Sequence, residues 1–264
     1  MQRTAWWVLL VVILGSGAAA YYFWQQGPRQ PLPPQPSKAA APPPPVSAEP
    51  AIRYPLDTGP AQPLPALGES DAAIWEALAG LLDRKSLTQF FYPDLMIRRI
   101  VATIDNLPRK KAPMRMMPVK PVPPPFARLG TGDNTVIGPG NSARYAAYVK
   151  VAQAVDARKL VDAYVRFYPL FQRAYEELGY PKGYFNDRLV ETLDDLLAAP
   201  DIKGPIKLTQ PKVMYEFADS ALEARSAGQK IMMRMGSENA AKVKARLREI
   251  RQEVTRRELK SKRP

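Results

Sequence analysis

The chain of 264 residues contains no cysteine and no histidine. Without cysteine, disulfides and thiolate chemistry are excluded. Without histidine, the chain lacks the usual general base near neutral pH and the commonest metal ligand. The composition therefore excludes Ser-His-Asp and Cys-His catalysis, zinc sites of the usual nitrogen and sulfur type, and haem held by histidine. Catalysis by carboxylates, lysine or serine is the chemistry that these absences leave open.

Several sequence signatures of nucleotide binding and nucleophilic catalysis are absent as well. The chain has no Walker loop, no G-x-G-x-x-G after a strand, no S-x-x-K, no G-x-S-x-G and no internal repeat. We therefore predict a protein that is not an enzyme and has no cofactor. We assign no catalytic, cofactor-binding or metal-binding residue.

Positive charge is concentrated at the C-terminus. The formal net charge is +13, and residues 242–264 contribute +7 of it, from ten Lys and Arg residues against Glu249, Glu253 and Glu258. Helical spacing places the apolar residues of this stretch on one face, namely Val243, Leu247, Ile250 and Val254. The ordinary interpretation is a packed helix with a solvated basic face, ending in a basic tail at 255–264. The alternative is contact with an anionic partner such as lipid headgroups or nucleic acid.

Residues 5–24 read AWWVLLVVILGSGAAAYYFW and carry no charge. About 20 helical residues cross a hydrocarbon core of roughly 30 Å, and Trp and Tyr at both ends are typical of the two membrane interfaces. A cleaved signal peptide is the alternative, with a small-residue site at 18–20, but the apolar run continues through Trp24. We predict a cytoplasmic tail at 1–4 and a transmembrane helix at 5–24.

The charges that flank this helix determine its predicted orientation. Arg3 precedes the helix in a very short tail, and Arg29 is the first cation after it. This asymmetry favours a cytoplasmic N-terminus. We therefore predict a single-pass inner-membrane protein, held in the lipid bilayer by residues 5–24, with its C-terminal domain in the periplasm.

Residues 25–66 are rich in proline, which removes hydrogen-bond donors and fixes φ. We predict a disordered Pro-rich linker that holds the following domain away from the membrane. A docking peptide for a reader of Pro-rich sequences is the alternative. Residues 67–264 have the periodicity of a mainly helical soluble domain.

The predicted domain is mainly α and bundle-like, with one short β-hairpin. Apolar stripes at helical spacing cover residues 96–107 and 164–178, and alternation at 206–217 predicts the hairpin. Gly179 and Pro181 are placed to end the second of these helices, so that Tyr180 can touch Tyr175. The predicted helix N-caps are Ser70 or Asp71, Asp156, Asn186 or Asp187, and Ser220 with Glu223 as a capping box.

Residues 108–142 are predicted to form a long loop rich in proline, glycine and cations, and a loop of this length is either functional or mobile. Six cations in it have no acidic residue among them: Arg109, Lys110, Lys111, Arg115, Lys120 and Arg128. Met114, Met116 and Met117 offer an adaptable apolar surface. The ordinary interpretation is an exposed loop that buries some of these methionines in the core.

Two groups of polar side chains near the corner at 179–187 are the candidate site residues. The phenols of Tyr180 and Tyr184 are placed with Arg188 to line a groove. Four carboxylates recur at near-helical spacing and are able to bind a hard cation or act as an acid/base pair, namely Asp187, Glu191, Asp194 and Asp195. The ordinary interpretation is a packed aromatic corner whose acidic residues complement a helix dipole or face solvent.

Five blocks of sequence carry a resemblance to a known family. They read SDAAIWEAL, RRIVATIDNLPR, YPLFQRAYEELGYPKGYFNDRL, FADSALEARSAGQKIMMRMG and ENAAKVKARLREIR, and all lie within residues 65–255. They resemble the bacterial domain-of-unknown-function 3014 family, in which an N-terminal span and a Pro-rich stretch precede one domain. The resemblance implies an envelope location and a single domain, and it implies no activity, substrate or catalytic residue.

These features predict a membrane-anchored envelope protein whose periplasmic domain is a non-catalytic binding or scaffolding module. Its predicted partner is an envelope protein, peptidoglycan or an anionic lipid surface. One alternative is an envelope enzyme that uses carboxylates and tyrosines at the corner. Another is a basic domain that binds anionic lipid or nucleic acid, and nucleic acid requires the opposite topology.

Overall fold

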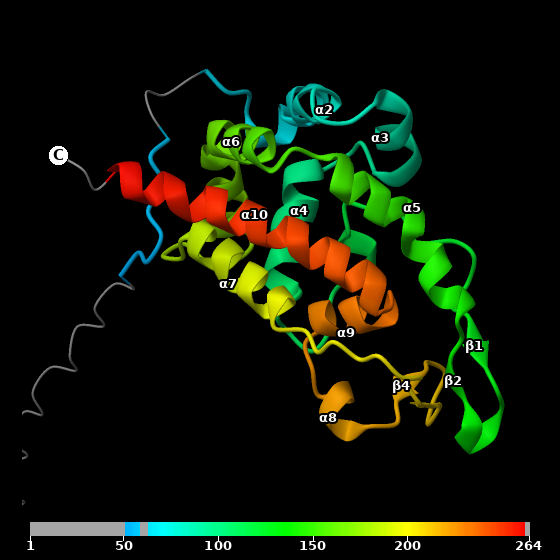
Figure 1. The fold of residues 1–264 in the computed structure, drawn as a ribbon. Coiled ribbons are helices and arrows are strands. Elements are labelled where there is room, and N and C mark those ends of the chain that lie inside the picture. Colours follow the sequence, from blue (N-terminus) through cyan, green and yellow to red (C-terminus); the bar gives the residue numbers. More distant parts are fainter. Residues whose placement is uncertain (1–50, 59–62, 262–264) are drawn as a thin grey trace, which may run out of the picture. The chain divides into compact units, whose positions relative to one another are not determined.

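The structure is a computed structural model, and it describes residues 51–58 and 63–261. Helices make up most of it (Figure 1). The mainly helical fold predicted from the sequence is confirmed. The α-helices are α2 (Asp71–Ala79), α3 (Arg84–Phe90), α4 (Met96–Asn106), α5 (Gly140–Ala154), α6 (Ala157–Glu177), α7 (Phe185–Leu197), α8 (Ser220–Glu223), α9 (Ala227–Arg234) and α10 (Ser237–Ser261). Short 3-10 helices are η1 (Leu67–Glu69), η2 (Met114–Met116) and η3 (Gly132–Asn134).

The two longest helices, α6 and α10, organise the packing. Helix α10 lies against α5, α6, α7 and α9, and α4 lies against α2, α6 and α7 (Figure 1). Val254 of α10 is buried with Val161 of α6 and Val190 of α7. Val243, which lies nearer to the start of α10, packs against a second cluster that contains Met232 and Met235. The apolar face predicted for α10 is therefore the face that joins it to the domain.

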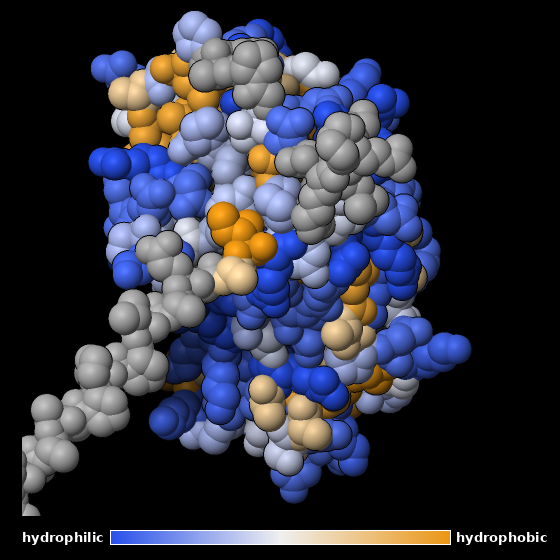
Figure 2. Space-filling model, turned by 90° about the vertical axis from the view of Figure 1, so that its left-hand side faces the viewer, coloured by the Kyte–Doolittle hydropathy of each residue, from blue (hydrophilic) through white to orange (hydrophobic). Residues whose placement is uncertain are grey.

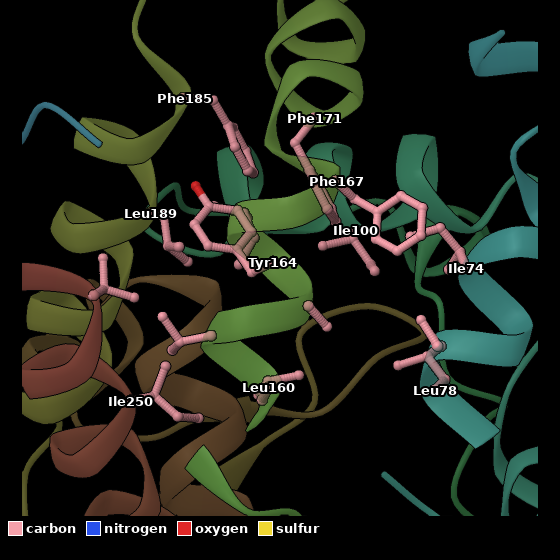
Figure 3. Close-up of a pocket in the computed structure, with 15 residues that line it drawn as sticks. Ile74, Leu78, Ile100, Leu160, Tyr164, Phe167, Phe171, Phe185, Leu189 and Ile250 are labelled. Atoms are coloured by element: carbon pink, nitrogen blue, oxygen red, sulfur yellow. The ribbon is translucent and has the colours of Figure 1, made fainter. Parts of the chain in front are cut away.

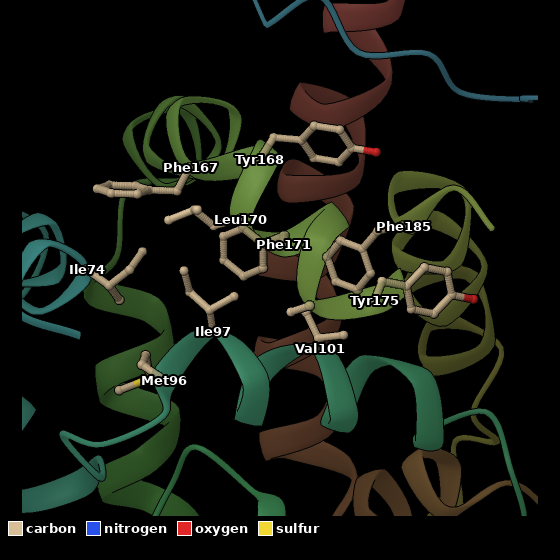
Figure 4. Close-up of a cluster of buried hydrophobic side chains, with 11 residues drawn as sticks. Ile74, Met96, Ile97, Val101, Phe167, Tyr168, Leu170, Phe171, Tyr175 and Phe185 are labelled. Carbon is tan, nitrogen blue, oxygen red and sulfur yellow. The ribbon is translucent and has the colours of Figure 1, made fainter. Parts of the chain in front are cut away.

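The aromatic stripe predicted on α6 lies at the centre of a hydrophobic core. Its buried side chains face Ile97 and Val101 of α4, and Figure 4 shows these two residues pointing from α4 toward the rings. Phe171 of α6 and Phe185 of α7 stack with ring centroids 5.8 Å apart. Because aromatic rings bury large areas, the packing of these rings with Ile97 and Val101 fixes α4, α6 and α7 together.

The corner between α6 and α7 has the predicted helix ending. Gly179 has a φ of +116°, and the N–H of Tyr180 donates to the carbonyl of Tyr175 at 3.3 Å. The Tyr175 and Tyr180 rings stack with centroids 4.5 Å apart. This is the Schellman arrangement, in which a left-handed residue is followed by a residue that bonds back to the third residue from the helix end. The predicted helix ending at Gly179 is therefore confirmed.

The caps predicted for the next helix are wrong. Helix α7 begins at Phe185, its N-cap residue is Tyr184, and no side chain caps it. Asn186 and Asp187 lie inside the first turn, because the helix starts earlier than the local sequence suggested. Their side chains contact residues 53–54 instead, as described below.

At α2 too, a predicted cap residue binds a distant segment instead of its own helix. Ser70 occupies the N-cap position of α2 without a side-chain cap bond. The Asp71 carboxylate instead accepts hydrogen bonds from the N–H groups of Leu95 (2.7 Å) and Met96 (2.9 Å), at the start of α4. The backbone of Leu95 itself has a left-handed conformation, with a φ of 53°. The acidic side chain of one helix therefore satisfies the free N–H groups of another.

Two short hairpins form instead of one. The predicted hairpin is present as β3 (Leu208–Thr209) paired with β4 (Glu216–Phe217). A second one, β1 (Arg128–Leu129) with β2 (Val136–Ile137), lies inside the predicted 108–142 loop. Backbone hydrogen bonds join the two, from Ile137 N–H to the carbonyl of Ile206 (2.9 Å) and from Leu208 N–H to that of Thr135 (2.8 Å). We call residues 128–137 and 206–217 the β lobe.

The segment predicted as one helix after Ser220 is divided in two. Asp219, rather than Ser220, caps α8, since its carboxylate accepts from the N–H groups of Ala221 and Leu222. Glu223 turns away from its predicted capping role and binds the N–H of Phe217 at 2.9 Å. Gly236, with a φ of +85°, separates α9 from α10, which begins at Ser237.

The predicted membrane segment lies outside the described residues. Within residues 51–58 and 63–261, no helix is long and apolar enough to cross a membrane. Of the predicted linker at 25–66, the structure describes residues 51–58 and 63–66. Leu56 and Leu64 pack against the aromatic core, so the C-terminal part of the predicted linker contacts the domain.

Candidate functional site

A polar cleft with a volume of about 300 Å³ lies at the corner between α6 and α7. It gathers the predicted groove residues together with two of the four predicted carboxylates. Its lining residues are Ala51, Arg53, Asp105, Arg109, Tyr175, Tyr180, Tyr184, Asp187, Arg188 and Glu191. Three arginines and three carboxylates thus face one another, and their pairing decides what the cleft can do.

Asp105, at the end of α4, is the buried centre of the cleft. Its side chain is 5% exposed and lies 2.9 Å from Nη2 of Arg109 and 3.2 Å from Nε of Arg188. The hydroxyl of Tyr180 donates to Asp105 Oδ2 at 3.3 Å. Arg188 also donates to the backbone carbonyl of Asp105 and forms an ion pair with Glu191 at 3.0 Å. The carboxylate is therefore enclosed by two guanidinium groups and one phenol of the same chain, and the Nε of Arg188 contacts it without a hydrogen bond.

These contacts affect the charge states of Arg109 and Tyr175. The hydrogen bond that Arg109 donates to Asp105 raises the pKa of the Arg109 guanidinium, so this side chain stays a cation. Burial raises the pKa of Tyr175 to about 12, with a contribution from the nearby Asp105 charge. Tyr175 is consequently a neutral phenol at physiological pH and is a poor general base.

The far side of the cleft binds the chain's own N-terminal segment. The carboxylate of Asp187 accepts hydrogen bonds from the N–H groups of Arg53 (3.0 Å) and Tyr54 (2.8 Å). The Tyr184 hydroxyl accepts from the N–H of Leu56 at 2.9 Å. Asn186, which is fully buried, donates to the carbonyl of Tyr54 at 2.8 Å. Residues 53–56 are therefore held through their backbone.

The remaining predicted carboxylates lie elsewhere. Asp194 forms an ion pair with Arg251 of α10. Asp195 accepts from the Ser226 hydroxyl at 2.7 Å and from the Gln229 amide at 3.0 Å, which fixes α9 to α7. In the part of the chain that the structure describes, no three acidic side chains are grouped to hold a metal ion. The four carboxylates thus serve four separate contacts.

The sequence reasoning missed Asp105 and placed Arg109 only in the loop. A signal was present, since Asp105 and Arg109 are four residues apart across the end of a helix, a spacing that favours an ion pair. Nothing local indicated that Arg188, 83 residues further on, would join them.

The family described as "protein of unknown function (DUF3014)" matches residues 96–251. The chain belongs to this family. The match confirms the resemblance carried by the sequence blocks. The DUF3014 match contains Asp105, Arg188 and the β lobe, and it leaves out α2, α3 and residues 51–58. Searches of curated proteins and of solved structures find no match to the chain.

The β lobe is a second candidate site within the DUF3014 match. Val213 and Met214, in the turn between β3 and β4, are 85% and 75% exposed, and Leu129 on β1 is 60% exposed. A polar hollow of about 610 Å³ lies between the hairpins, lined in part by Arg128 and Tyr215. Figure 1 shows this lobe beside the start of α5 and next to α8, at a distance from α2 and α6. It combines exposed apolar side chains with polar groups.

Elsewhere, large apolar side chains on the surface are scattered. Figure 2 shows a face on which hydrophilic side chains predominate and hydrophobic ones gather in small separate areas. Single exposed apolar residues are ordinary on a protein surface, whereas neighbouring ones on a projecting lobe indicate an interaction site.

The basic face of α10 is largely engaged within the domain. Lys244 donates to the carbonyl of Ala199, Arg251 pairs with Asp194, and Arg257 pairs with Asp162 of α6. Of the predicted loop cations, Arg109 lines the cleft and Lys120 donates to the carbonyl of Thr88 at 2.7 Å. Lys110, Lys111 and Arg115 are exposed. The loop also buries Met117 and leaves Met114 68% exposed.

Proposed function

We propose that this protein is a membrane-anchored, non-catalytic binding module of the cell envelope, and that the β lobe is its contact surface for a partner protein. The observation that carries the proposal is the exposure of Val213 and Met214 on the turn of β3–β4. Methionine is enriched at protein interfaces and adapts its shape to a partner. Burying both side chains in a complex would remove apolar surface from water.

The arrangement of the polar cleft supports a structural role for it rather than catalysis. Asp105 is surrounded by donors, and Asp187 is occupied by the backbone of residues 53–54. A catalytic acid or base needs a free position beside a reacting atom. A carboxylate and tyrosine enzyme at this corner is the second candidate function, because Tyr184, Asp187, Arg188 and Glu191 do line one cleft. Its groups would first have to release residues 53–56.

A site-specific crosslink tests the binding surface. A photoreactive amino acid at Val213 in the full-length chain, irradiated in living cells, is expected to give a discrete protein adduct. Met214→Asp in the same chain is expected to abolish it, because a carboxylate cannot enter an apolar contact. The matched control carries the photoreactive residue at Arg158, an exposed position on α6. Absence of an adduct at 213, or the same adduct at 158, would refute the β lobe as the contact surface.

The proposed topology has an independent test. Residues 5–24 form the anchor in this proposal, the N-terminus lies in the cytoplasm, and the domain is periplasmic. Alkaline phosphatase fused after Pro264 is active only in the periplasm, so we expect activity from the fusion. An inactive, stable fusion would overturn the topology and make the nucleic-acid alternative the better one for the basic C-terminus.

A further inference from the structure

The strands of the β lobe form one antiparallel arrangement with two outer edges. β1 pairs with β2, β3 pairs with β4, and an antiparallel bridge between Val136 and Lys207 joins the two hairpins. The strands therefore lie in the order β1–β2–β3–β4, with β1 at one edge and β4 at the other. Because the outer side of an edge strand carries backbone groups that no neighbouring strand pairs, an edge is where a further strand can be added.

The edge at β4 is closed by a side chain. The hydrogen bond of this hairpin runs from the N–H of Ala218 to the carbonyl of Lys207, so the N–H of Phe217 points away from β3. The carboxylate of Glu223, on α8, accepts this outward N–H at 2.9 Å. Lys230 holds Glu223 in turn through an ion pair of 2.7 Å. The outward donor of β4 is thus satisfied within the domain.

The edge at β1 is open. The N–H of Gly138 donates to the carbonyl of Ala127 at 3.0 Å, which makes the next pair, Arg128 with Ile137, the type without mutual hydrogen bonds. The backbone N–H and C=O of Arg128 therefore point away from β2, and in the part of the chain that the structure describes neither group has a partner. Both residues of β1 are exposed, Leu129 to 60%.

This edge fits one kind of occupant, an extended peptide. An antiparallel strand offers one acceptor and one donor to the outward N–H and C=O of a single residue, and it makes both hydrogen bonds at once. Its successive side chains point to opposite faces of the sheet. One face presents the apolar side chain of Leu129, and the other presents Arg128, which borders the polar hollow of about 610 Å³.

Charge selects the residue that lies opposite Arg128. A residue that exchanges hydrogen bonds with Arg128 projects its side chain to the same face, where opposite charges stabilise the pair and like charges destabilise it. A second copy of this chain, paired about Arg128, would set two arginines against each other. Cations also outnumber acids in the lobe by three to two: Arg128, Lys207 and Lys212 against Asp133 and Glu216. An acidic residue of another protein is therefore favoured at this position.

We propose that the β1 edge binds an extended segment of the partner protein as an added antiparallel strand, in which acidic and apolar residues alternate. The proposal rests on the proposed function, because it states how the β lobe holds its partner. The acidic residue exchanges both hydrogen bonds with Arg128, and its apolar neighbours lie beside Leu129. Since the polar hollow borders both Arg128 and Tyr215, the partner continues across it toward the turn that carries Val213 and Met214.

A synthetic peptide of alternating glutamate and valine tests the proposal. The fluorescein-labelled peptide is titrated with the full-length protein in lipid nanodiscs, and saturable binding is expected from the fluorescence anisotropy. Methylation of the glutamate nitrogens removes the N–H groups that face β1 and should weaken binding at least about tenfold, the loss expected for one hydrogen bond. Methylation of the valine nitrogens removes only N–H groups on the outer side and should leave binding unchanged. Equal affinity of the two methylated peptides, or no saturable binding of the parent peptide, would overturn the proposal.

Two variants at one position separate backbone from charge. Arg128→Ala removes the charge and should weaken binding of the parent peptide about threefold, as the loss of one cross-strand pair does. Arg128→Pro also removes the outward N–H, at an edge position where proline is tolerated, and should weaken binding about tenfold more. Circular dichroism and thermal unfolding establish that both variants are folded. Equal affinities of the two variants would refute the backbone contact.

The peptide assay and the cellular crosslink at Val213 fail separately. An adduct at Val213 without peptide binding would leave the β lobe as the contact surface and refute strand addition. Peptide binding without any cellular adduct would refute the proposed function and, with it, a partner protein on this edge. A full-length chain that dimerises, and that Arg128→Pro converts to a monomer, would assign the edge to a second copy and overturn the proposal as well.

Discussion

The polar cleft at the corner of α6 and α7 differs in the chemistry of its lining from an apolar hollow of about 160 Å³ that is bordered by α2, α6 and α10 (Figure 3). In the cleft, Asp105 is enclosed by Arg109, Tyr180 and Arg188, and Asp187 is bound to residues 53–54. In the hollow, apolar side chains such as Ile74, Phe171 and Ile250 face unfilled space, and the hydroxyl of Tyr164 is bonded to Asn186. The cleft therefore holds its elements together through ion pairs and hydrogen bonds, whereas the elements around the hollow meet through apolar side chains alone.

The aromatic residues of α6 and α7 line both the polar cleft and the apolar hollow. Phe171 and Phe185 line the hollow, and Tyr175 lines the cleft. Phenylalanine can border a dry space without leaving a polar atom unpaired, while a tyrosine places its hydroxyl at the polar edge. This choice of ring lets one stripe of side chains support a charged network and an apolar space. The comparison makes four predictions, given from the largest expected effect to the smallest.

Removing the centre of the cleft should have the largest effect. Asp105→Ala leaves Arg188, whose side chain is 14% exposed, without its buried partner. Breaking a buried ion pair by removing one member costs about 3–5 kcal/mol. We therefore expect the free energy of unfolding, measured with urea, to fall by this amount.

The matched control for this change is Asp194→Ala. Asp194 is also paired with an arginine, but its side chain is 46% exposed. A surface pair contributes roughly 0–1 kcal/mol. If the two variants lost equal stability, the cleft would not be a structural centre.

Added side-chain volume should change stability in opposite directions in the two regions. A Cβ at Gly183 would lie 2.7 Å from Cε1 of Tyr175 and 2.9 Å from Cβ of Tyr180, in the tightly stacked corner. We expect Gly183→Ala to destabilise by about 1–3 kcal/mol, as overpacking does. Ala77→Leu adds more volume, but it points into the hollow and should be neutral or stabilising. Thermal unfolding of both variants measures this, and equal destabilisation would mean that the hollow is not free space.

Alkaline pH should report on the buried phenols of both regions. Burial raises the pKa of Tyr164, which lines the hollow, and raises that of Tyr175 to about 12. The unfolded chain loses these protons from about pH 10, before the folded protein does, so it binds fewer protons above this pH. The free energy of unfolding should then be level below pH 10 and fall as pH rises toward 12.

Single substitutions assign this slope. Tyr175→Phe and Tyr164→Phe each remove one titrating phenol and should flatten the decline. The flattening should be greater for Tyr164, whose hydroxyl is more deeply enclosed. Unfolding by urea at a series of alkaline pH values measures it. An unchanged slope in both variants would show that other groups cause the decline.

How much of this was predictable depends on how local each contact is. The stripe of α6, the turn at Gly179 and the apolar face of α10 follow from periodicity and local turn chemistry, which a sequence displays directly. Asp71 and Asp187 obeyed the same local rules as helix-start residues, yet they bind segments 24 and 134 residues away. Tertiary contacts had replaced the local caps at these two positions.

The hollow could not be predicted for a different reason. A periodic pattern indicates which face of a helix is apolar, and it does so correctly for Leu78, Ile100 and Ile250. It does not tell whether the facing helices come close enough to fill the space between those faces. The unpartnered Nε atoms of Arg188 and Arg246 are equally invisible, because tertiary packing decides which acceptors lie near them.

The smallest effect tests the N-terminal side of the cleft. Asp187→Ala removes the acceptor of two backbone N–H groups at Arg53 and Tyr54, on a segment at the edge of the domain. Since a hydrogen bond contributes about 1 kcal/mol and edges open locally, the global free energy of unfolding should change little. Amide hydrogen exchange of residues 51–56 should instead become much faster.

Glu191→Ala is the matched control, because Glu191 lines the same cleft and pairs with Arg188 but does not contact residues 53–54. Exchange at residues 51–56 should be unchanged in this variant. If Asp187→Ala left that exchange unchanged too, Tyr184 and Asn186 would be sufficient to hold the segment. If both variants accelerated it equally, the segment would depend on the charge balance of the whole cleft. The chain that leads from the proposed anchor passes through residues 51–56. Only a selective increase of exchange in Asp187→Ala would show that a single carboxylate holds this segment against the domain.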